Sequence, residues 1–348
     1  MKIVIDDKIP FIRGSVERCG KVVYLPVEGI TPAAVADADA LFVRTRTRID
    51  APLLDGSRVK FVATATIGLD HINFDYCRRN GIFATNAPGC NAPAVAQYVL
   101  ASVAALFAKK GETLNPSGLT IGIVGVGHVG KIVERWCRQL GFNVMLNDPP
   151  RAEEEGDAAF VGLDEIAAKA DIVTFHTPLT REGRYPSWHL AGSGFFANCR
   201  RRPIIVNAAR GPVTDTAALI RAIDEGTVSR AVIDCWEGEP RISRELLRRA
   251  DIATPHIAGY SLQGKIRATT ICLDFFSRHF GITPPITIPE KAPMEIPDVS
   301  SMEQIASSYN PFDDMRLLLD APDNFENLRD FYRLRNEVVG CRQRECPL

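Results

Sequence analysis

The sequence predicts an α/β protein built from parallel sheets with helices on both faces. Short runs rich in β-branched residues alternate with helical segments along most of the 348 residues, the order that parallel sheets require. A glycine-rich turn directly follows one of these runs, as in nucleotide-binding sheets. A chain of this length exceeds what one small core supports, so we expect two or three domains.

Charge and cysteine content narrow the class of protein. The formal net charge is −1 and no long basic run occurs, which argues against nucleic acid as the main partner. The nine cysteines are scattered and never spaced as CxxC, so they predict reduced thiols of a cytoplasmic protein. The start of the chain does not resemble a signal peptide. The most apolar stretch, residues 99–108, is too short to span a bilayer, so we expect no membrane partner.

Five strand candidates occupy the first part of the chain. Helical stretches at residues 31–38 and 72–80 lie between them, and a long apolar helix then runs from Asn91 to Lys110. This order predicts a first parallel sheet. The five candidates are residues 2–6, 22–25, 40–44, 61–66 and 81–86.

Six further strand candidates follow, the number expected of a complete dinucleotide-binding sheet. A helical segment at residues 262–280 comes next, and five prolines between Pro284 and Pro297 then predict an extended connector. The tail from Met302 onward is expected to be ordered and helical. The six candidates are residues 119–126, 142–148, 171–177, 203–209, 230–236 and 251–255.

The glycine-rich turn is Gly125-x-Gly127-x-x-Gly130, between a strand candidate and a helical segment. Gly125 permits the tight turn, Gly127 lets the backbone approach a pyrophosphate, and Gly130 allows close packing of helix on strand. The next strand ends at Asp148, where a carboxylate can accept hydrogen bonds from ribose hydroxyls and repel a 2′-phosphate. NAD is therefore favoured over NADP, although Arg151 lies nearby. A nucleotide-free α/β domain or a methyltransferase that binds S-adenosylmethionine remain alternatives.

Three polar residues follow three successive strand candidates. Arg210, Glu239 and His256 can converge on one crevice, because ligands of open α/β sheets bind outside the carboxyl ends of the strands. Histidine exchanges a proton near neutrality, a carboxylate orients and charges it, and arginine binds a substrate carboxylate. Beside a nicotinamide, this set suits hydride transfer to or from a 2-hydroxy acid. Taken singly, each residue is also compatible with an ordinary surface or structural role.

Four segments, "GIVGVGHVG", "VNAARGPVTD", "AVIDCWEGEP" and "TPHIAGYS", resemble the D-2-hydroxyacid dehydrogenase superfamily. The resemblance implies two doubly wound parallel-sheet domains of the Rossmann or flavodoxin-like kind. It implies a split substrate-binding domain of residues 1–88 and 257–285, with an NAD-binding domain of residues 89–256 inserted into it. Another member acting on a substrate such as 3-phosphoglycerate, or an NAD-sensing dimeric corepressor, remain alternatives that a turnover assay separates.

The tail resembles the extra C-terminal domain of one family within this superfamily. "YNPFDD" and "FENLRDFYRLRNE" carry that resemblance, with Asn336 where the family pattern has arginine. It implies a small α+β dimerisation domain over residues 286–348, a homodimer, and the oxidation of a phosphorylated four-carbon sugar acid in the pyridoxal phosphate pathway. The apolar residues Phe325, Leu328, Phe331 and Tyr332 recur at helical spacing, so we expect one buried helix face, on a segment detached from the main sheets.

The superfamily pattern also implies roles for individual residues. Arg210, Glu239 and His256 would be catalytic, with His256 as the proton donor or acceptor. The expected NAD contacts, besides the three glycines, are Asp148, Thr177, Ala208, Ala209, Arg210, Asp234 and Gly259. The expected substrate contacts are Thr45, Thr66 and Tyr260.

The stretch "RTRTR", Arg44 to Arg48, suggests a phosphate site. If this stretch is extended, its arginines share one side, and Arg44 or Arg46 could hold the substrate phosphate. Solvated loop arginines are an equal alternative. The other five histidines have no carboxylate or cysteine at metal-ligand spacing, so we predict no metal.

Overall fold

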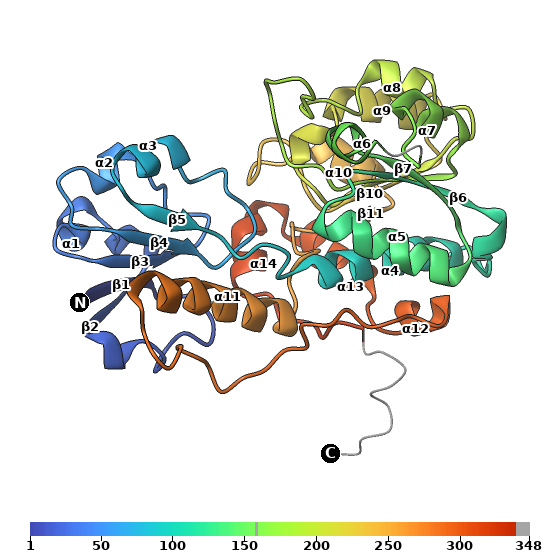
Figure 1. The fold of residues 1–348 in the computed structure, drawn as a ribbon. Coiled ribbons are helices and arrows are strands. Elements are labelled where there is room, and N and C mark those ends of the chain that lie inside the picture. The colour runs from blue at the N-terminus through green and yellow to red at the C-terminus, as the bar shows by residue number, and fades with distance from the viewer. Residues whose placement is uncertain (157–158, 339–348) are drawn as a thin grey trace, which may run out of the picture. The chain divides into compact units, whose positions relative to one another are not determined.

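A computed structural model describes residues 1–156 and 159–338 and shows two compact units. Unit 1 comprises Met1–Asn91 and Ser261–Glu295, and unit 2 comprises Ala92–Tyr260 and the chain from Ile296 onward (Figure 1). The tail expected as a third domain from residue 286 is thus divided between the two units. None of the described helices is both long enough and apolar enough to cross a membrane.

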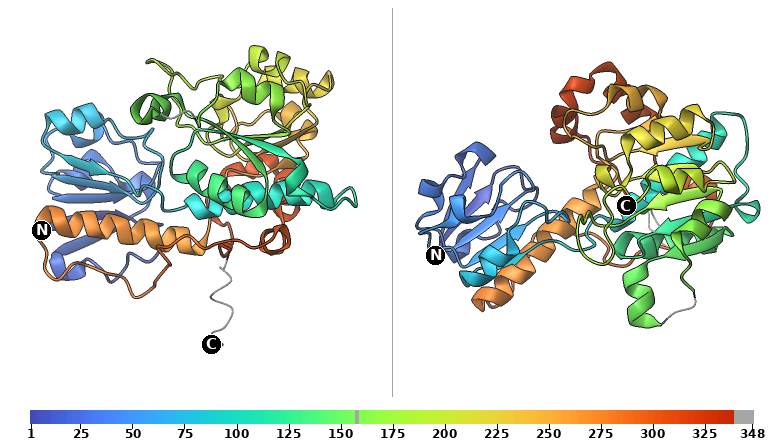
Figure 2. Two further views of the ribbon diagram at one scale, coloured as in Figure 1. Left: turned by 45° about the vertical axis from the view of Figure 1, so that its right-hand side comes forward. Right: turned by 90° about the horizontal axis from the view of Figure 1, so that it is seen from above.

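The first unit contains a five-stranded parallel sheet, and its five strands confirm those predicted from the sequence. The strand order is β2-β1-β3-β4-β5. One face of the sheet packs against α11, and the other packs against α1, α2 and α3 (Figure 1, Figure 2). The central strands β3 and β4 are buried at every residue because both faces of the sheet are covered. The bounds are β1 Lys2–Asp6, β2 Lys21–Leu25, β3 Ala40–Val43, β4 Phe61–Thr64, β5 Phe83–Thr85, α1 Pro32–Val35, α2 Ala51–Leu54, α3 Phe74–Arg79 and α11 Leu262–Phe280.

The second unit contains a six-stranded parallel sheet in the order β11-β10-β9-β8-β6-β7. The six strands confirm those predicted. Strand β7 lies on one side of β6, and β8 to β11 follow on the other side, so the strand order switches between β6 and β8. Such sheets bind nucleotides at this position. Helices α4 and α5 cover one face, and α7 to α10 cover the other. The strands are β6 Thr120–Val124, β7 Asn143–Asn147, β8 Ile172–Phe175, β9 Ile204–Asn207, β10 Arg230–Ile233 and β11 Ile252–Ala253. The helices are α4 Ala92–Ala108, α5 His128–Leu140, α6 Pro149–Glu155, α7 Leu163–Lys169, α8 Ser193–Ala197, α9 Thr216–Asp224 and α10 Arg244–Arg249.

The C-terminal segment packs on the second unit, so the expectation that the proline-rich connector detaches it is wrong. Helix α12 (Met302–Ala306) packs against α4, and α13 (Pro311–Asp320) packs against β11. The buried side chain of Ile305 belongs to one hydrophobic core of the unit, and those of Leu318 and Phe325 belong to the other. Their packing removes apolar surface from water. Within the described residues, this segment contains helices but no strand.

The last helix is shorter than its apolar spacing suggests. Helix α14 ends at Asp330, so Phe331 does not share a helix face with Phe325. Phe325 is fully buried, whereas Phe331 is 84% exposed. The expected single buried face over this stretch is therefore wrong.

Candidate active site

The glycine-rich turn connects β6 to α5 and has the geometry of a phosphate cradle. Gly125 has a φ of 87°, and a Cβ there would meet the Thr177 backbone nitrogen at 2.8 Å. A Cβ on Gly130 would meet the Gly125 carbonyl oxygen at 2.2 Å, so only glycine allows this approach of helix and turn. Nothing lies within 4 Å of a Cβ built on Gly127. The turn therefore leaves open space before the N-terminus of α5, as a bound pyrophosphate requires.

Asp148, directly after β7, is tied to that turn. Its Oδ2 accepts a hydrogen bond from the Val126 backbone nitrogen at 2.7 Å, and its Oδ1 accepts one from the Arg151 backbone nitrogen at 3.2 Å. The Arg151 guanidinium makes two 2.8 Å contacts with Glu155, so its charge is already paired. A carboxylate is thus fixed beside the glycine turn, where it fits the ribose of NAD.

Thr177 and the turn after β9 are further positions where the sequence predicts contacts with the cofactor. The Oγ1 of Thr177 is buried and has no hydrogen-bond partner within the described part of the chain, so a bound ligand could supply one. Asn207 shapes the turn that carries Ala208 and Ala209: its Oδ1 accepts from the Ala209 nitrogen at 3.2 Å, and its Nδ2 donates to the Arg210 carbonyl at 3.0 Å. Sequence reasoning missed Asn207, although it lies within the "VNAARG" segment.

His256 and Glu239 form a hydrogen-bonded pair. The Nδ1 of His256 lies 2.7 Å from the Oε2 of Glu239, and the Oε1 of Glu239 accepts from the Trp236 backbone nitrogen at 2.8 Å. Because Nδ1 bonds to Glu239, Nε2 is the His256 nitrogen that this pair does not use. The backbone of His256 has a φ of 56°, an uncommon conformation outside glycine that often marks functional positions.

The pair favours a charged imidazole. Burial by itself lowers the pKa of His256, but the Cys235 sulfur and the Glu239 carboxylate beside the ring outweigh burial and raise the pKa well above 6.5. Burial likewise raises the pKa of Glu239, but the His256 ring and the Trp236 amide bring it below 4.5. The arrangement therefore stabilises the ion pair and holds a proton on the ring until the pH is high enough to remove it.

Asp234 supports the loop that carries His256. It is 1% exposed, and its carboxylate accepts from the Thr254 hydroxyl at 2.6 Å, the Ile257 nitrogen at 2.8 Å and the Ala258 nitrogen at 3.0 Å. Burial raises the pKa of Asp234. Because this carboxylate is already satisfied by the loop, the structure gives it a supporting role, and its burial does not favour the expected direct contact with NAD.

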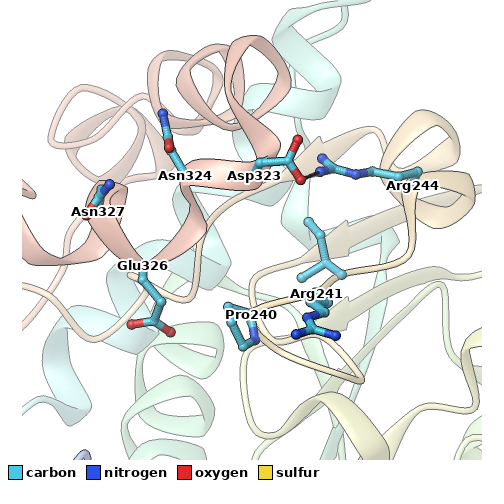
Figure 3. A pocket seen from close by; sticks show the side chains of 8 residues that line it. Pro240, Arg241, Arg244, Asp323, Asn324, Glu326 and Asn327 are labelled. Carbon is cyan, nitrogen blue, oxygen red and sulfur yellow. Dashed lines mark hydrogen bonds and ion pairs between the residues drawn. The ribbon is translucent and has the colours of Figure 1, made fainter.

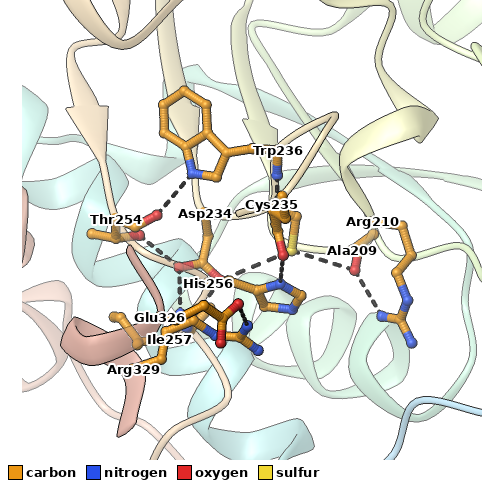
Figure 4. A network of polar contacts seen from close by, with 12 residues as sticks. Ala209, Arg210, Asp234, Cys235, Trp236, Thr254, His256, Ile257, Glu326 and Arg329 are labelled. Carbon is orange, nitrogen blue, oxygen red and sulfur yellow. Dashed lines mark hydrogen bonds and ion pairs between the residues drawn. The ribbon is translucent and has the colours of Figure 1, made fainter. Parts of the chain in front are cut away.

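Arg210 follows β9, the strand next to β10 in the sheet, and β10 in turn neighbours β11. The three expected catalytic residues thus follow three adjacent strands of the sheet. Figure 4 labels two of them, Arg210 and His256. The guanidinium of Arg210 donates to the Ala209 carbonyl at 2.8 Å. Among the three expected catalytic residues, His256 and Glu239 are hydrogen-bonded to each other. A role for Arg210 in binding the substrate stays a prediction.

Cys235 is a neighbour of the pair that sequence reasoning missed. Ligand atoms of Cys235, Glu239 and His256 lie within 4.8 Å of one another, a set that could hold a metal ion. A metal would have to open the 2.7 Å hydrogen bond of the pair and remove the proton of a thiol whose pKa burial raises. The absence of a metal stays a prediction. A single cysteine without ligand spacing gives no signal in the sequence.

The expected substrate residues Thr45, Thr66, Arg44 and Arg46 belong to unit 1. The "RTRTR" stretch is a turn rather than an extended strand, because β3 ends at Val43 and the Thr47 nitrogen donates to the Arg44 carbonyl at 3.1 Å. The Nε of Arg44 pairs with the buried carboxylate of Asp6 at 2.9 Å. Arg46 is exposed. The hydroxyl of Thr66 lies 2.9 Å from that of Thr64, after β4.

A separate pocket of about 510 Å³ lies in unit 2 between the loop after Glu239 and the start of α14 (Figure 3). Arg244 and Asp323 form an ion pair across it. None of the expected catalytic residues lines this pocket, so we assign it no part in the reaction. Its lining residues are Pro240, Arg241, Ile242, Arg244, Asp323, Asn324, Glu326 and Asn327.

The glycine cradle, the acidic end of β7 and the histidine–carboxylate pair define an NAD-dependent 2-hydroxyacid dehydrogenase. Residues 101–258 match the family model described as the NAD-binding domain of D-isomer specific 2-hydroxyacid dehydrogenases. The chain belongs to the erythronate-4-phosphate dehydrogenase family. It is 47% identical to the erythronate-4-phosphate dehydrogenase of Bacteroides thetaiotaomicron over 97% of both chains. It is 39% identical to that of Cronobacter sakazakii over 97% of this chain and 92% of the relative.

Solved structures share the fold. One is a D-lactate dehydrogenase from Aquifex aeolicus in complex with NAD and lactic acid, with a TM-score of 0.67 and 22% identity over 84% of this chain and 100% of that one. Another is a 3-phosphoglycerate dehydrogenase from Entamoeba histolytica with bound NAD+, with a TM-score of 0.69 and 24% identity over 84% of this chain and 99% of that one. At these identities the likeness establishes the fold and not the substrate.

Replacing Asp148 by asparagine is expected to weaken the preference for NAD over NADP. Asparagine keeps the shape of the side chain and one acceptor oxygen, which can serve either the Val126 or the Arg151 nitrogen, and it removes the charge that repels a 2′-phosphate. Hydrogen bonds to charged groups contribute about 1.5–3 kcal/mol, so we expect the ratio of kcat/KM for the two cofactors to fall by about 10- to 100-fold. Steady-state kinetics with each cofactor measures this ratio. Equal use of both cofactors by the unmodified protein would contradict the role given to Asp148.

Proposed function

We propose that the protein oxidises 4-phospho-D-erythronate to (R)-3-hydroxy-2-oxo-4-phosphonooxybutanoate with NAD, a reaction of pyridoxal 5′-phosphate biosynthesis. The observation that carries this proposal is the His256–Glu239 pair at the carboxyl edge of a nucleotide-binding sheet, in a chain of this family. Formation of NADH from NAD and 4-phospho-D-erythronate, followed by absorbance, tests it. Binding of NAD without turnover of any 2-hydroxy acid would instead favour an NAD-sensing protein.

The residues of unit 2 account for the proton movement. NAD, when bound over the glycine cradle, supplies the acceptor for the hydride that leaves C2. The neutral His256 takes the proton of the C2 hydroxyl at Nε2, while Glu239 holds Nδ1 and stabilises the imidazolium that forms. Arg210 binds the substrate carboxylate and polarises the developing carbonyl. The substrate thus loses one hydride and one proton, and a C=O bond replaces the C–H and O–H bonds.

The remaining expected contacts are part of the same proposal. Thr45 and Thr66 of unit 1 and Tyr260 of unit 2 would contact the substrate, and Gly259, beside Tyr260, would contact NAD. Of the two arginines expected at the phosphate, Arg46 is exposed, so its replacement is the simpler test of binding. The guanidinium of Arg44 already neutralises a buried carboxylate.

The rate of oxidation is expected to rise with pH through the pKa of His256, because only the neutral ring can accept a proton. Glu239 favours the charged ring, so Glu239→Gln should lower that pKa and move the inflection to lower pH. The pH dependence of kcat/KM, which reports the free enzyme, measures the shift. A Glu237→Gln variant is the matched control, since Glu237 makes a 2.7 Å contact with another ring, that of His189. An unchanged inflection in Glu239→Gln would remove Glu239 from the pair.

A homodimer is a further part of the proposal. Leu317, Leu319 and Phe331 of the C-terminal segment are large apolar side chains exposed on this chain, as expected of a surface that a second copy covers. Replacing Leu317 and Phe331 together by glutamate is therefore expected to yield monomers in sedimentation velocity. Met294→Glu, at an exposed apolar position of unit 1, controls for the added charge. A double variant that stays dimeric would place the interface elsewhere.

We also propose a cytoplasmic location. None of the seven cysteines among the described residues is in a disulfide, as expected in a reducing compartment. Labelling with a thiol reagent after denaturation, without prior reduction, should detect every cysteine of the purified protein.

A further inference from the structure

The loop from Thr254 to Tyr260 carries His256 together with Gly259 and Tyr260, which are expected to contact cofactor and substrate. Asp234 binds backbone nitrogens on one side of this loop, those of Ile257 and Ala258. The carbonyl oxygens of the loop also need donors. That of Thr254 accepts from the Trp236 indole nitrogen at 2.9 Å, and that of Ile257 accepts from the Tyr260 nitrogen at 2.8 Å. A residue that donates to these carbonyls therefore also helps to fix the position of the His256 ring.

A single guanidinium from the C-terminal segment provides further donors to three of these carbonyls. The Nη1 of Arg335 donates to the carbonyl oxygens of Ile257 and Tyr260, each at 3.0 Å. Its Nη2 donates to the carbonyl of Ala258, and to that of Ala94 in α4 at 3.1 Å. Arg335 therefore joins three carbonyls of the loop to a helix of the unit core.

The position of Arg335 is itself fixed. Its guanidinium carbon lies 4.5 Å from the centre of the Tyr309 ring, and its Nη1 lies 3.3 Å from the hydroxyl of Tyr332. Both tyrosine hydroxyls donate to the Oδ2 of Asp314, at 2.7 Å and 3.0 Å, which places a carboxylate behind the cation. A planar fork with five donors can serve carbonyls on two sides, which a lysine ammonium cannot do in the same geometry.

We propose that Arg335 is a positioning residue for the His256–Glu239 pair. By holding the carbonyls of residues 257, 258 and 260, it fixes the loop so that the His256 ring meets Glu239 on one side and the substrate hydroxyl on the other. Its effect on turnover depends on the proposed function, whereas its effect on the His256 pKa does not. The C-terminal segment thus contributes to catalysis within its own chain, separately from any role between copies.

The test compares Arg335→Ala with Arg316→Ala. Arg316 is an exposed arginine of the same segment whose ion pair is with Asp313 on the same helix, so its loss should leave turnover unchanged. Arg335→Ala should lower kcat by about 10²-fold, the effect of a displaced catalytic group, and move the pH inflection of kcat/KM to lower pH. Free guanidinium ion at millimolar concentration should restore part of the rate, because it can occupy the vacated position.

A second readout is independent of turnover. The imidazole pKa of His256, followed by NMR of protein labelled at histidine and assigned with His256→Asn, should fall in Arg335→Ala and stay unchanged in Arg316→Ala. If the unmodified protein does not oxidise 4-phospho-D-erythronate, the proposed function fails while this measurement still tests the positioning role. If the alanine variant does not fold, Arg335→Lys is measured in its place and is expected to show the same lowered pKa. An Arg335 variant with unchanged kcat and unchanged His256 pKa would overturn the proposal, as would a loss of rate without a change in this pKa.

Discussion

Replacing His256 by alanine is expected to lower turnover by about 10²- to 10⁴-fold, the usual effect of losing a general base. The Nε2 of His256 is the atom proposed to accept the C2 hydroxyl proton, and water at neutral pH is a much weaker base. Binding of NAD should be largely kept, because the glycine cradle and Asp148 follow other strands of the sheet. Single-turnover kinetics isolates the chemical step, and titration calorimetry measures NAD affinity.

The chain offers a matched control for that experiment. His189 lies 2.7 Å from Glu237, the same distance as in the His256–Glu239 pair, and it too has a positive φ of 52°. His189→Ala removes an equivalent pair away from the proposed reaction, so it should keep near-normal turnover. If His256→Ala also kept near-normal turnover with chemistry rate-limiting, His256 would be a structural loop histidine.

The second large effect concerns the substrate phosphate. We expect kcat/KM for 4-phospho-D-erythronate to exceed that for D-erythronate by at least about 100-fold, which corresponds to about 2.7 kcal/mol. A phosphate distant from C2 contributes binding energy that also positions the reacting carbon. Replacing Arg46 by alanine should reduce this ratio while affecting the unphosphorylated acid less. Buffers without phosphate or sulfate are needed, since either anion could compete.

Variants of the neighbouring arginines distinguish a direct contact with the phosphate from a general effect of positive charge. Arg48 lies in the same stretch, is exposed and pairs with Asp50, so Arg48→Ala should leave the ratio unchanged. Arg44→Ala would leave the buried Asp6 carboxylate without its partner and is expected to destabilise the fold, which makes it a poor test of binding. If D-erythronate or 3-phospho-D-glycerate were used as well as 4-phospho-D-erythronate, the assigned substrate would be wrong.

The sequence was sufficient to predict the strands and the pairing of Glu239 with His256. Strands that are covered on both faces are continuous apolar segments, which can be recognised from the sequence alone. Parallel strands bring their carboxyl ends to one edge of the sheet. The glycine turn was predictable because positions 125 and 130 tolerate no Cβ. These features depend on local backbone geometry and on one rule of sheet topology.

Other features depend on contacts between distant segments, which no local pattern reveals. The C-terminal helices look detachable because prolines precede them, yet Leu318 and Phe325 complete the core of unit 2. The turn at "RTRTR" depends on where β3 ends. The hydrogen bonds of Asp234 could not be distinguished in advance from a cofactor contact, because both uses place a carboxylate at the same strand end.

The partnership between Arg335 and the His256 loop also bears on how the chain is made. Arg335 is 78 residues downstream of Ile257, whose carbonyl it binds, so a ribosome must synthesise most of the protein before the loop gains this guanidinium. Domains generally fold in the order of synthesis, and the glycine cradle and its sheet precede the loop. A chain cut short by a premature stop codon or by a protease before residue 335 would keep the strands of the nucleotide sheet but lack the group that orders its histidine. Such fragments are expected to reduce NAD more slowly than the full chain, even where they still bind it.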